Sequence, residues 1–236
     1  MSVTIDAAMT GGNGGACQYI LGNLTSATST GMTVGASASC LLVLFSLGAN
    51  SVAVSSPACT WNGVSMNLAM FINNAASPQL SAGIFVLLNP TSGNHTIAMS
   101  WTGASDGYIS AISLIGTDLV TGYKSADNVT GTATTGITPN IAVNTDVNGA
   151  TLVIVGDTSG GNAPAPNNQT QLFTNDDSSP NAGASYALGG TGTNTHGFNV
   201  LTGAVCVVWA GIHIIAPASG PALTPGNLYL ESDEYF

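Results

Sequence analysis

The chain has 236 residues, of which only Lys124 is basic and eleven are acidic, so its formal net charge is −10 at pH 7. Nucleic-acid-binding proteins neutralise phosphates with lysine and arginine, and peripheral membrane proteins place basic clusters on anionic headgroups. Since this chain has a single basic residue, its composition excludes both classes.

The remaining composition predicts an ordered protein made of short strands. Hydrophobic residues make up 44% of the chain, which is too many for a disordered segment, and 30 glycines and 10 prolines indicate many turns. Charged residues make up 5%, against about a quarter in ordinary soluble domains. A surface with so little charge is typical of permanent subunit contacts.

Three stretches alternate apolar with small or polar residues, at 3–9, 64–72 and 95–101. Successive strand side chains point to opposite faces, so this period of two predicts half-buried strands. Four continuous apolar runs, at 40–47, 84–88, 152–155 and 205–215, predict strands buried on both faces. Turn signals separate them, among them 104–107 and Asn148-Gly149.

No stretch has a convincing helical period. We therefore predict an all-β fold: a two-sheet antiparallel β-sandwich of roughly 10–14 strands, with little or no helix. The predicted sandwich is one domain, residues 1–216, whose first 24 residues are an N-terminal strand or lead-in. Within it, the polar segment 156–183 is long for a loop, and we expect a brief strand at 171–173.

Residues 217–236 form a predicted C-terminal arm. Three prolines in its first nine residues favour an extended path, and Glu231, Asp233 and Glu234 make its end acidic. We interpret the segment as an arm that docks on a neighbouring subunit, with a frayed terminus as the alternative. The apolar residues expected to mediate docking are Leu228, Tyr229, Leu230, Tyr235 and Phe236.

The four cysteines show no metal-binding spacing. Cys40 and Cys206 lie in apolar runs and are expected to be buried thiols. Cys17 and Cys59 lie in loop-like surroundings, so they are the candidates for a disulfide within or between subunits. The sequence leaves the three possible pairings open.

The order of the segments resembles jelly-roll-like sandwich modules of tailed-phage virion proteins and of some bacterial secreted proteins. The likeness covers roughly residues 25–216 and carries no catalytic residues. The segments concerned are CLLVLFSLG, SVAVSSPACTWNGVSMNLAMF, IFVLLNPTSGNHTIAMSW, GYISAISLIGTD, ATLVIVGDTSGG and AVCVVWAGIHI. The resemblance implies a sandwich fold and a structural role. The first fifteen residues lack a basic n-region and a long apolar core, which favours the phage class over the secreted one.

The sequence indicates no enzyme. A glycosidase needs two facing carboxylates, yet the only glutamates lie in the arm, and the Gly-x-Ser-x-Gly motif of serine hydrolases is absent. His95, His196 and His213 lie in three distant segments, so we expect structural histidines and not a shared metal site.

We expect neither a bound metal nor a cofactor. Asp157, Asp176 and Asp177 are the oxygen-bearing candidates for calcium, but solvated turn residues are the favoured interpretation because no Asp-x-Asp-x-Asp loop occurs. Trp61, beside the Asn62-Gly63 turn, is the candidate glycan contact, whereas Trp101 and Trp209 lie in apolar strands and are expected in the core.

These features predict a non-enzymatic virion structural protein on the outer surface of a tailed bacteriophage, either a capsid decoration protein or a fibre or appendage subunit. It would act by packing against copies of itself and other virion proteins, such as the major capsid protein or a tail fibre, with no nucleic acid or membrane as partner. The alternative is an extracellular carbohydrate-binding module or adhesin, secreted or part of a phage receptor-binding protein.

Overall fold

The structure is a computed structural model that describes residues 1–10, 17–29, 31–49, 54–74, 79–133, 137–158, 163–175, 180–199 and 206–218. Within these ranges the chain forms seventeen strands and one short 3-10 turn, η1 (Ser125–Asp127). No helix in the described ranges is long and apolar enough to cross a membrane.

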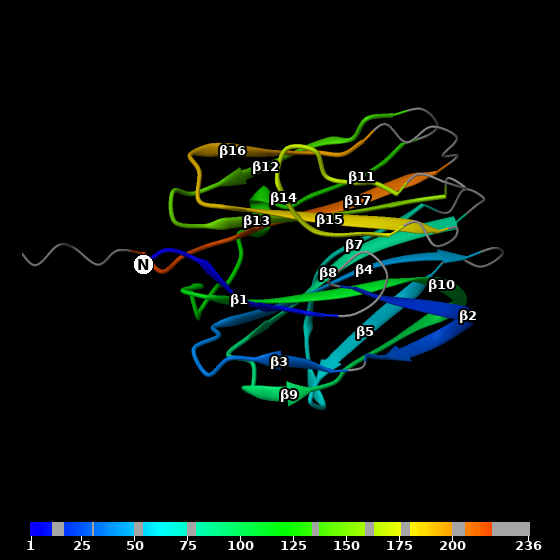
Figure 1. Cartoon of the computed structure of the whole chain (residues 1–236), viewed down its shortest axis with the longest axis horizontal. Coiled ribbons are helices and arrows are strands. Elements are labelled where there is room, and N and C mark those ends of the chain that lie inside the picture. Colours follow the sequence, from blue (N-terminus) through cyan, green and yellow to red (C-terminus); the bar gives the residue numbers. More distant parts are fainter. Residues whose placement is uncertain are drawn as a thin grey trace, which may run out of the picture.

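The larger sheet has eight strands and only antiparallel pairs, in the order β6-β5-β10-β4-β8-β7, with β1 and β2 also pairing with β10. It forms the lower part of Figure 1. Its strands are β1 (Thr4–Ala8), β2 (Cys17–Thr28), β4 (Cys40–Ala49), β5 (Ser55–Trp61), β6 (Val64–Ser65), β7 (Asn67–Asn74), β8 (Gln79–Leu88) and β10 (Ile97–Ile115).

The second sheet has five antiparallel strands in the order β11-β17-β13-β15-β14 and lies above the first in Figure 1. Its strands are β11 (Val129–Ala133), β13 (Ala150–Asp157), β14 (Thr170–Asn175), β15 (Asn181–Leu188) and β17 (Val207–Ile214). Two short ribbons complete the fold, β3 (Met32–Val34) with β9 (Gly93–His95), and β12 (Asn140–Thr145) with β16 (Gly192–Gly197). The predicted all-β sandwich is confirmed, but the described ranges hold seventeen strands where 10–14 were expected, because strands of two or three residues such as β3, β6 and β9 leave no periodic signal.

Strands buried on both faces explain the continuous apolar runs. In β4, Leu42 and Leu44 belong to an inter-sheet core that also contains Leu152 and Ile154 of β13. Their neighbours in β4, including Phe45, point to the other face of the larger sheet and belong to a second core with Trp61 and Trp101. Since both faces of β4 are covered, neither needs polar residues, and the period of two disappears from the sequence.

A third apolar layer lies on the outer side of the second sheet. Val153 and Val155 of β13 pack there with Ile141 and Val143 of β12 and with Phe198. Figure 1 shows the ribbon β12–β16 above this face. The two-sheet sandwich thus carries an additional layer, which the sequence pattern does not predict.

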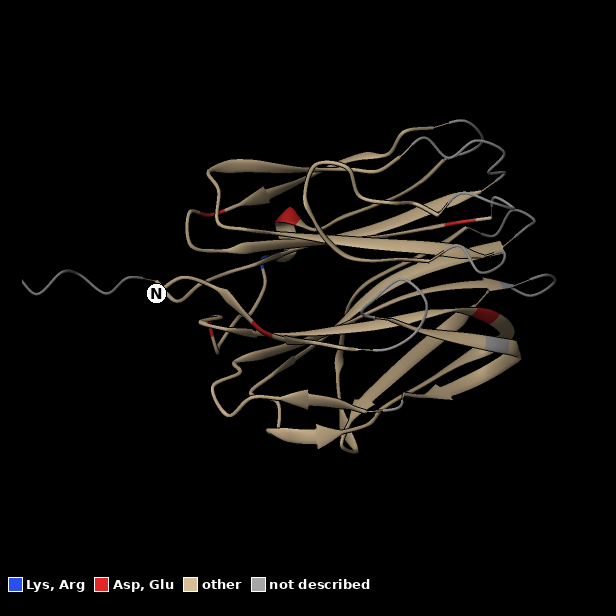
Figure 2. Ribbon diagram, in the orientation of Figure 1, with Lys and Arg blue, Asp and Glu red and all other residues tan. Residues whose placement is uncertain are grey.

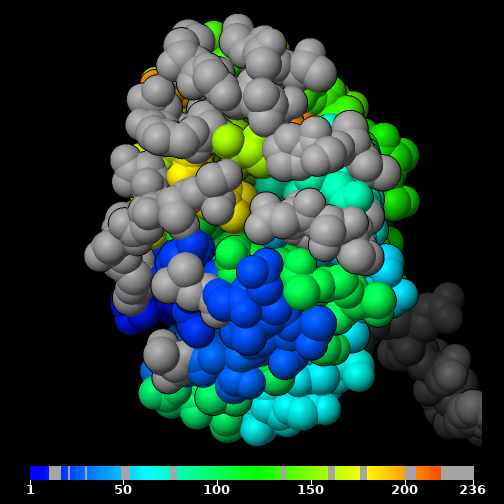
Figure 3. Space-filling model, turned by 90° about the vertical axis from the view of Figure 1, so that its right-hand side faces the viewer, coloured from blue at the N-terminus to red at the C-terminus, as the bar shows by residue number. Residues whose placement is uncertain are grey.

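The turn predicted at 104–107 is wrong, because β10 runs through it without interruption. The register shifts between Ser100 and Gly107 mark a β-bulge, and Gly103 there has a positive φ of 91°. Asp106 fixes the bend, since its Oδ1 accepts hydrogen bonds from the N–H groups of Gly22 and Asn23 in β2, at 2.8 and 2.7 Å. The bent pair β2–β10 forms the lower half of the face seen in Figure 3.

Two other local predictions are confirmed. Asn62 and Gly63 form the turn between β5 and β6, with φ of 48° and 76°, as a type I′ hairpin requires. The brief strand expected at 171–173 is part of β14.

Candidate functional site: a groove beside the Lys124–Asp127–His213 network

The site is built on the loop that follows β10. The Asp118 carboxylate closes its turn, because Oδ1 accepts hydrogen bonds from the N–H groups of Val120 and Thr121 at 3.0 and 2.7 Å. Both hydrogen bonds lower the pKa of Asp118, and the bond from the Thr121 N–H contributes most. Gly122 follows with φ of 70°, and an added Cβ there would lie 2.7 Å from a methyl group of Leu88. Only glycine therefore fits this position without strain.

The loop then pairs with the end of β17. Lys124 donates its N–H to the carbonyl of His213 at 3.0 Å, and Ile215 donates to the carbonyl of Gly122 at 3.1 Å. Tyr123 forms a β-bridge with Ile214. The last described stretch of the chain therefore lies along this loop.

A surface groove of about 440 Å³ lies between this loop and the larger sheet. Asn67 at the start of β7, residues 86–88 at the end of β8, and Val120 and Tyr123 of the loop line it. Asn67 Nδ2 donates a hydrogen bond to the Tyr123 hydroxyl at 3.0 Å, whereas Val120 is 91% exposed. None of the described residues that line the groove is acidic or basic. It therefore suits an uncharged ligand or the apolar side chains of another segment.

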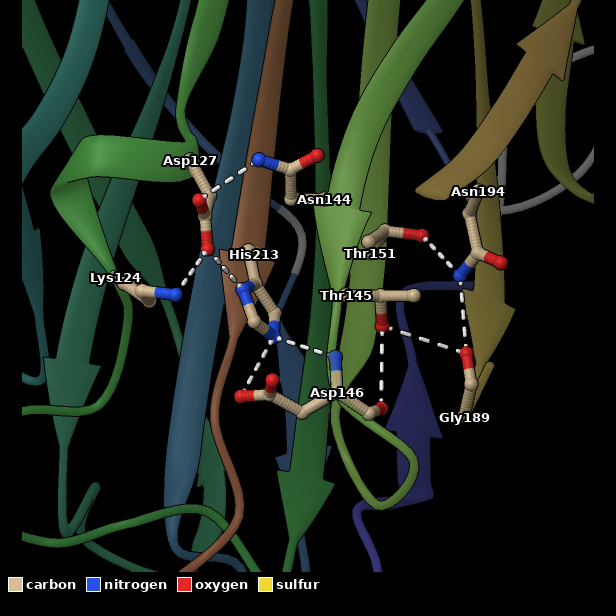
Figure 4. A network of polar contacts seen from close by, with 9 residues as sticks. All are labelled: Lys124, Asp127, Asn144, Thr145, Asp146, Thr151, Gly189, Asn194 and His213. Carbon is tan, nitrogen blue, oxygen red and sulfur yellow. Dashed lines mark hydrogen bonds and ion pairs between the residues drawn. The ribbon is translucent and has the colours of Figure 1, made fainter. Parts of the chain in front are cut away.

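Beside the groove, one carboxylate collects three hydrogen-bond donors (Figure 4). Asp127 of η1 accepts from Asn144 Nδ2 at 3.0 Å, from His213 Nδ1 at 2.9 Å and from Lys124 Nζ at 3.0 Å. The bond from Asn144 is the largest contribution, and together the three lower the pKa of Asp127 to about 2. The hydrogen bond and charge of Asp127 in turn raise the pKa of Lys124.

His213 has both ring nitrogens engaged. The N–H of Asp146 donates to Nε2 at 3.2 Å, the Asp146 carboxylate lies 3.6 Å from the same nitrogen, and Nδ1 lies 2.9 Å from Asp127 Oδ2. The ring is buried, and it faces the opposite side of β17 from Ile212 and Ile214. A general base needs a free nitrogen within reach of a substrate. This histidine instead joins β17, η1 and the turn after β12.

His196 of β16 is a second buried histidine, in contact with two hydroxyl groups. Its Nδ1 lies 2.7 Å from Ser185 Oγ and its Nε2 lies 2.9 Å from Thr151 Oγ1. Burial lowers its pKa to about 4. A serine beside a histidine is half of a nucleophilic pair. Ser185 is fully buried, however, and the second nitrogen of the ring contacts a hydroxyl in place of an orienting carboxylate. The group is therefore a structural tie between β13, β15 and β16.

The predicted glycan contact at Trp61 is wrong. Trp61 is the last residue of β5, so it precedes the turn and points inward, as Cys59 does two positions earlier. It is fully buried, its Nε1 donates to the carbonyl of Thr91 at 3.0 Å, and the His95 ring packs edge-on against it. Trp101 is buried as expected, and Trp209 is partly buried against the outer layer.

Cys17 and Cys59, the candidates for a disulfide, do not form one, because all four cysteines are buried and none lies in a disulfide. Cys17 and Cys59 pair with opposite parts of β10, at Ser110 and Met99, and belong to different cores. A disulfide requires Cα atoms within about 7 Å. Burial also prevents either thiol from reaching a second subunit. Burial raises the pKa values of Cys40 and Cys59 to about 12.

The calcium candidates receive no support from the described part of the chain. Asp157 is fully buried at the end of β13, where Asn181 Nδ2 donates to its Oδ1 at 3.3 Å. Across the described ranges, no three His, Cys, Asp or Glu side chains gather as a metal site requires. Asp176 and Asp177 lie outside the described residues, and so do the predicted docking residues Leu228, Tyr229, Leu230, Tyr235 and Phe236.

The sequence predicts a structural role for His213, but it gives no prediction for Asp127 or for the groove. Asp127 follows Lys124 by three residues, which is a spacing typical of a local ion pair. This spacing is the one feature of the sequence that could have indicated a role for Asp127. The groove forms from β7, β8 and the loop after β10, which are distant in sequence, so no local pattern reveals it.

No protein-family model matches the chain, and no curated protein matches it in sequence.

Proposed function

We propose that this chain is a non-enzymatic structural subunit of the outer surface of a tailed-phage virion, a capsid decoration protein or an appendage subunit, that acts by packing against copies of itself and other virion proteins. The observation that carries the proposal is that the polar groups of the fold are used to hold the fold together. Both buried histidines have both nitrogens engaged by neighbouring elements.

The carboxylates support the same proposal. Asp6 accepts hydrogen bonds from the Gly35 N–H and the Ser113 hydroxyl, and Asp106, Asp118 and Asp127 each accept several bonds from nearby groups. Figure 2 shows how few charged residues remain on the ribbon. A surface with so little charge lacks the repulsion that keeps soluble monomers apart.

The proposal is tested by sizing the full chain and a variant that lacks residues 217–236. The full chain is expected to form oligomers, and the deletion is expected to weaken them while circular dichroism and the unfolding midpoint stay near those of the full chain. A full chain that remains monomeric at all concentrations contradicts self-packing. Immunogold labelling of phage particles tests the virion assignment separately, because it requires the protein on the particle exterior.

A second candidate is a carbohydrate-binding module. The groove favours it, because Tyr123 offers an aromatic face and Asn67 an amide in a hollow without charged side chains. A glycan array distinguishes the two candidates. A monomeric chain that binds a glycan, with binding abolished by Tyr123→Ala, supports the carbohydrate-binding module.

A further inference from the structure

The groove lies where the chain leaves the described structure. Ile215 is hydrogen bonded to Gly122 and to Asp118 of the loop that forms one wall of the groove, and the described chain ends three residues later, at Ala218. Three residues span at most about 11 Å. The described chain therefore ends within about 11 Å of the residue that contacts the wall of the groove.

The chemistry of that segment matches the groove and its margin. Leu228, Tyr229 and Leu230 are apolar, and the groove offers Leu88 and the exposed Val120. The next residues include Glu231, Asp233 and Glu234, which form the most concentrated negative charge of the chain.

Lys124 supplies the complementary charge. It is the only basic residue of the chain, it lies between the groove residues Tyr123 and Ser125, and its side chain is 53% exposed. One carboxylate, Asp127, already contacts its ammonium group. An ammonium group has three donors, so a second carboxylate can bind from the solvent side.

The length of the segment lets it reach the groove of another copy. Leu228 lies ten positions after Ala218, so a fully extended path between them reaches about 31 Å. That reach exceeds the distance to the chain's own groove, whose wall Ile215 contacts through Gly122, and it is long enough to extend to a neighbouring subunit.

We propose that the groove beside Lys124 is the acceptor for residues 227–236 of a second copy of this chain, with Leu228 and Leu230 packing on Val120 and Leu88, and the acidic residues near Lys124. This inference rests on the proposed function, because it names the surface through which the subunits associate.

The test measures the association constant of the full chain by sedimentation velocity over a range of concentrations. Val120→Asp places a charge in the buried contact and is expected to weaken association at least about tenfold. The matched control is Val147→Asp in the turn after β12, where Val147 is 64% exposed and away from the groove. It is expected to leave association within about twofold of wild type.

Charge reversal tests the second contact. Lys124→Glu is expected to weaken association by roughly two- to fivefold, as befits an exposed ion pair. Adding Glu231→Lys and Glu234→Lys to Lys124→Glu is expected to restore it. A local effect of Lys124→Glu on Asp127 would not be reversed by changes in the tail, so rescue identifies a contact between the two segments.

The outcomes separate this inference from the proposed function. Association that is equal in wild type, Val120→Asp and Leu228→Asp/Leu230→Asp overturns the groove as acceptor and leaves self-packing intact. A wild-type chain that is monomeric at every concentration overturns both. A free peptide of residues 219–236, added in excess, is expected to lower the mean mass of the full chain. An unchanged mean mass overturns the inference.

Discussion

His196 and His213 are both buried, but His196 contacts only hydroxyl groups, whereas His213 contacts a carboxylate that also binds Lys124. The first site lies beneath the ribbon β12–β16 and is enclosed by three strands. The second lies at the edge of the sandwich, next to the groove. The same residue type thus serves as an uncharged interior tie in one place and as part of an ion-pair network in the other.

The two sites are joined by polar contacts through two neighbouring turns (Figure 4). Asn194 Nδ2 donates to Thr151 Oγ1, which is a partner of His196, and to the carbonyl of Gly189. The Thr145 hydroxyl shares its proton between the carbonyls of Gly189 and Asp146. Asp146 in turn donates its N–H to His213. The two sites differ in what sets the pKa of their titratable group: burial lowers the pKa of His196, whereas hydrogen bonds lower the pKa of Asp127.

The largest expected effect comes from removing the interior histidine. His196→Ala leaves a cavity and deprives the buried hydroxyls of Ser185 and Thr151 of their partner, and we expect a loss of about 3–4 kcal/mol in the free energy of unfolding. Urea unfolding followed by fluorescence measures it. His95→Ala, at a partly buried position, serves as the control with a smaller loss. Equal losses of unfolding free energy in His196→Ala and His95→Ala would show that the contacts of His196 with Ser185 and Thr151 do not stabilise the fold beyond an ordinary packing contact.

The next effect is the pH dependence of stability that His196 contributes. Its pKa falls from an ordinary 6.5 to about 4, so the unfolded chain binds the proton more readily between these values. Stability is then full above pH 6.5 and decreases as the pH falls toward 4, by up to about 3 kcal/mol. Urea titrations at several pH values measure this slope. His196→Gln, which cannot titrate, is expected to flatten it, and an unchanged slope would contradict the assignment.

Asp127 is expected to act in a lower pH window. Its pKa falls from 3.8 to about 2, so the stability it contributes is present above pH 4 and is lost as the pH falls through 2. Asp127→Asn removes the charge that holds His213, Asn144 and Lys124, and we expect a loss of about 2 kcal/mol at pH 7. Acid unfolding below pH 4 should be less steep in this variant. If the two profiles coincide, the network does not stabilise the fold.

The smallest expected effect is that of the exposed lysine. Lys124→Gln removes an ion pair whose basic side chain is 53% exposed, and we expect a much smaller change in the free energy of unfolding than that of Asp127→Asn. Chemical denaturation at low and high salt measures it. A loss as large as that of Asp127→Asn would mean that Lys124, and not His213, is the main partner of Asp127.

The sequence predicts the strands better than it predicts their surroundings. Period and turn chemistry identify β4, β13 and the Asn62-Gly63 hairpin, because these signals are local. The same signals fail at 104–107, where a glycine and an aspartate support a bulge within a long strand. They also fail for Trp61, since exposure depends on which face the rest of the sheet covers.

The candidate site depends almost entirely on contacts between distant segments. Asp127 meets Asn144 and His213 from two other elements, and the groove joins β7 and β8 to the loop after β10. Contacts between segments far apart in the sequence produce no local hydrophobic period, so neither the Asp127 network nor the groove could be predicted. The sequence used the single basic residue only to exclude nucleic-acid and membrane partners, whereas the structure places Lys124 at the margin of the groove.

The central claim is that the chain functions by associating with copies of itself. Sedimentation velocity of the intact chain, over a hundredfold range of concentration, tests it most directly. We expect the mean mass to rise with concentration above that of one chain, and we expect Val120→Asp, but not Val147→Asp, to shift this rise to at least about tenfold higher concentration. A single species with the mass of one chain at every concentration would contradict it.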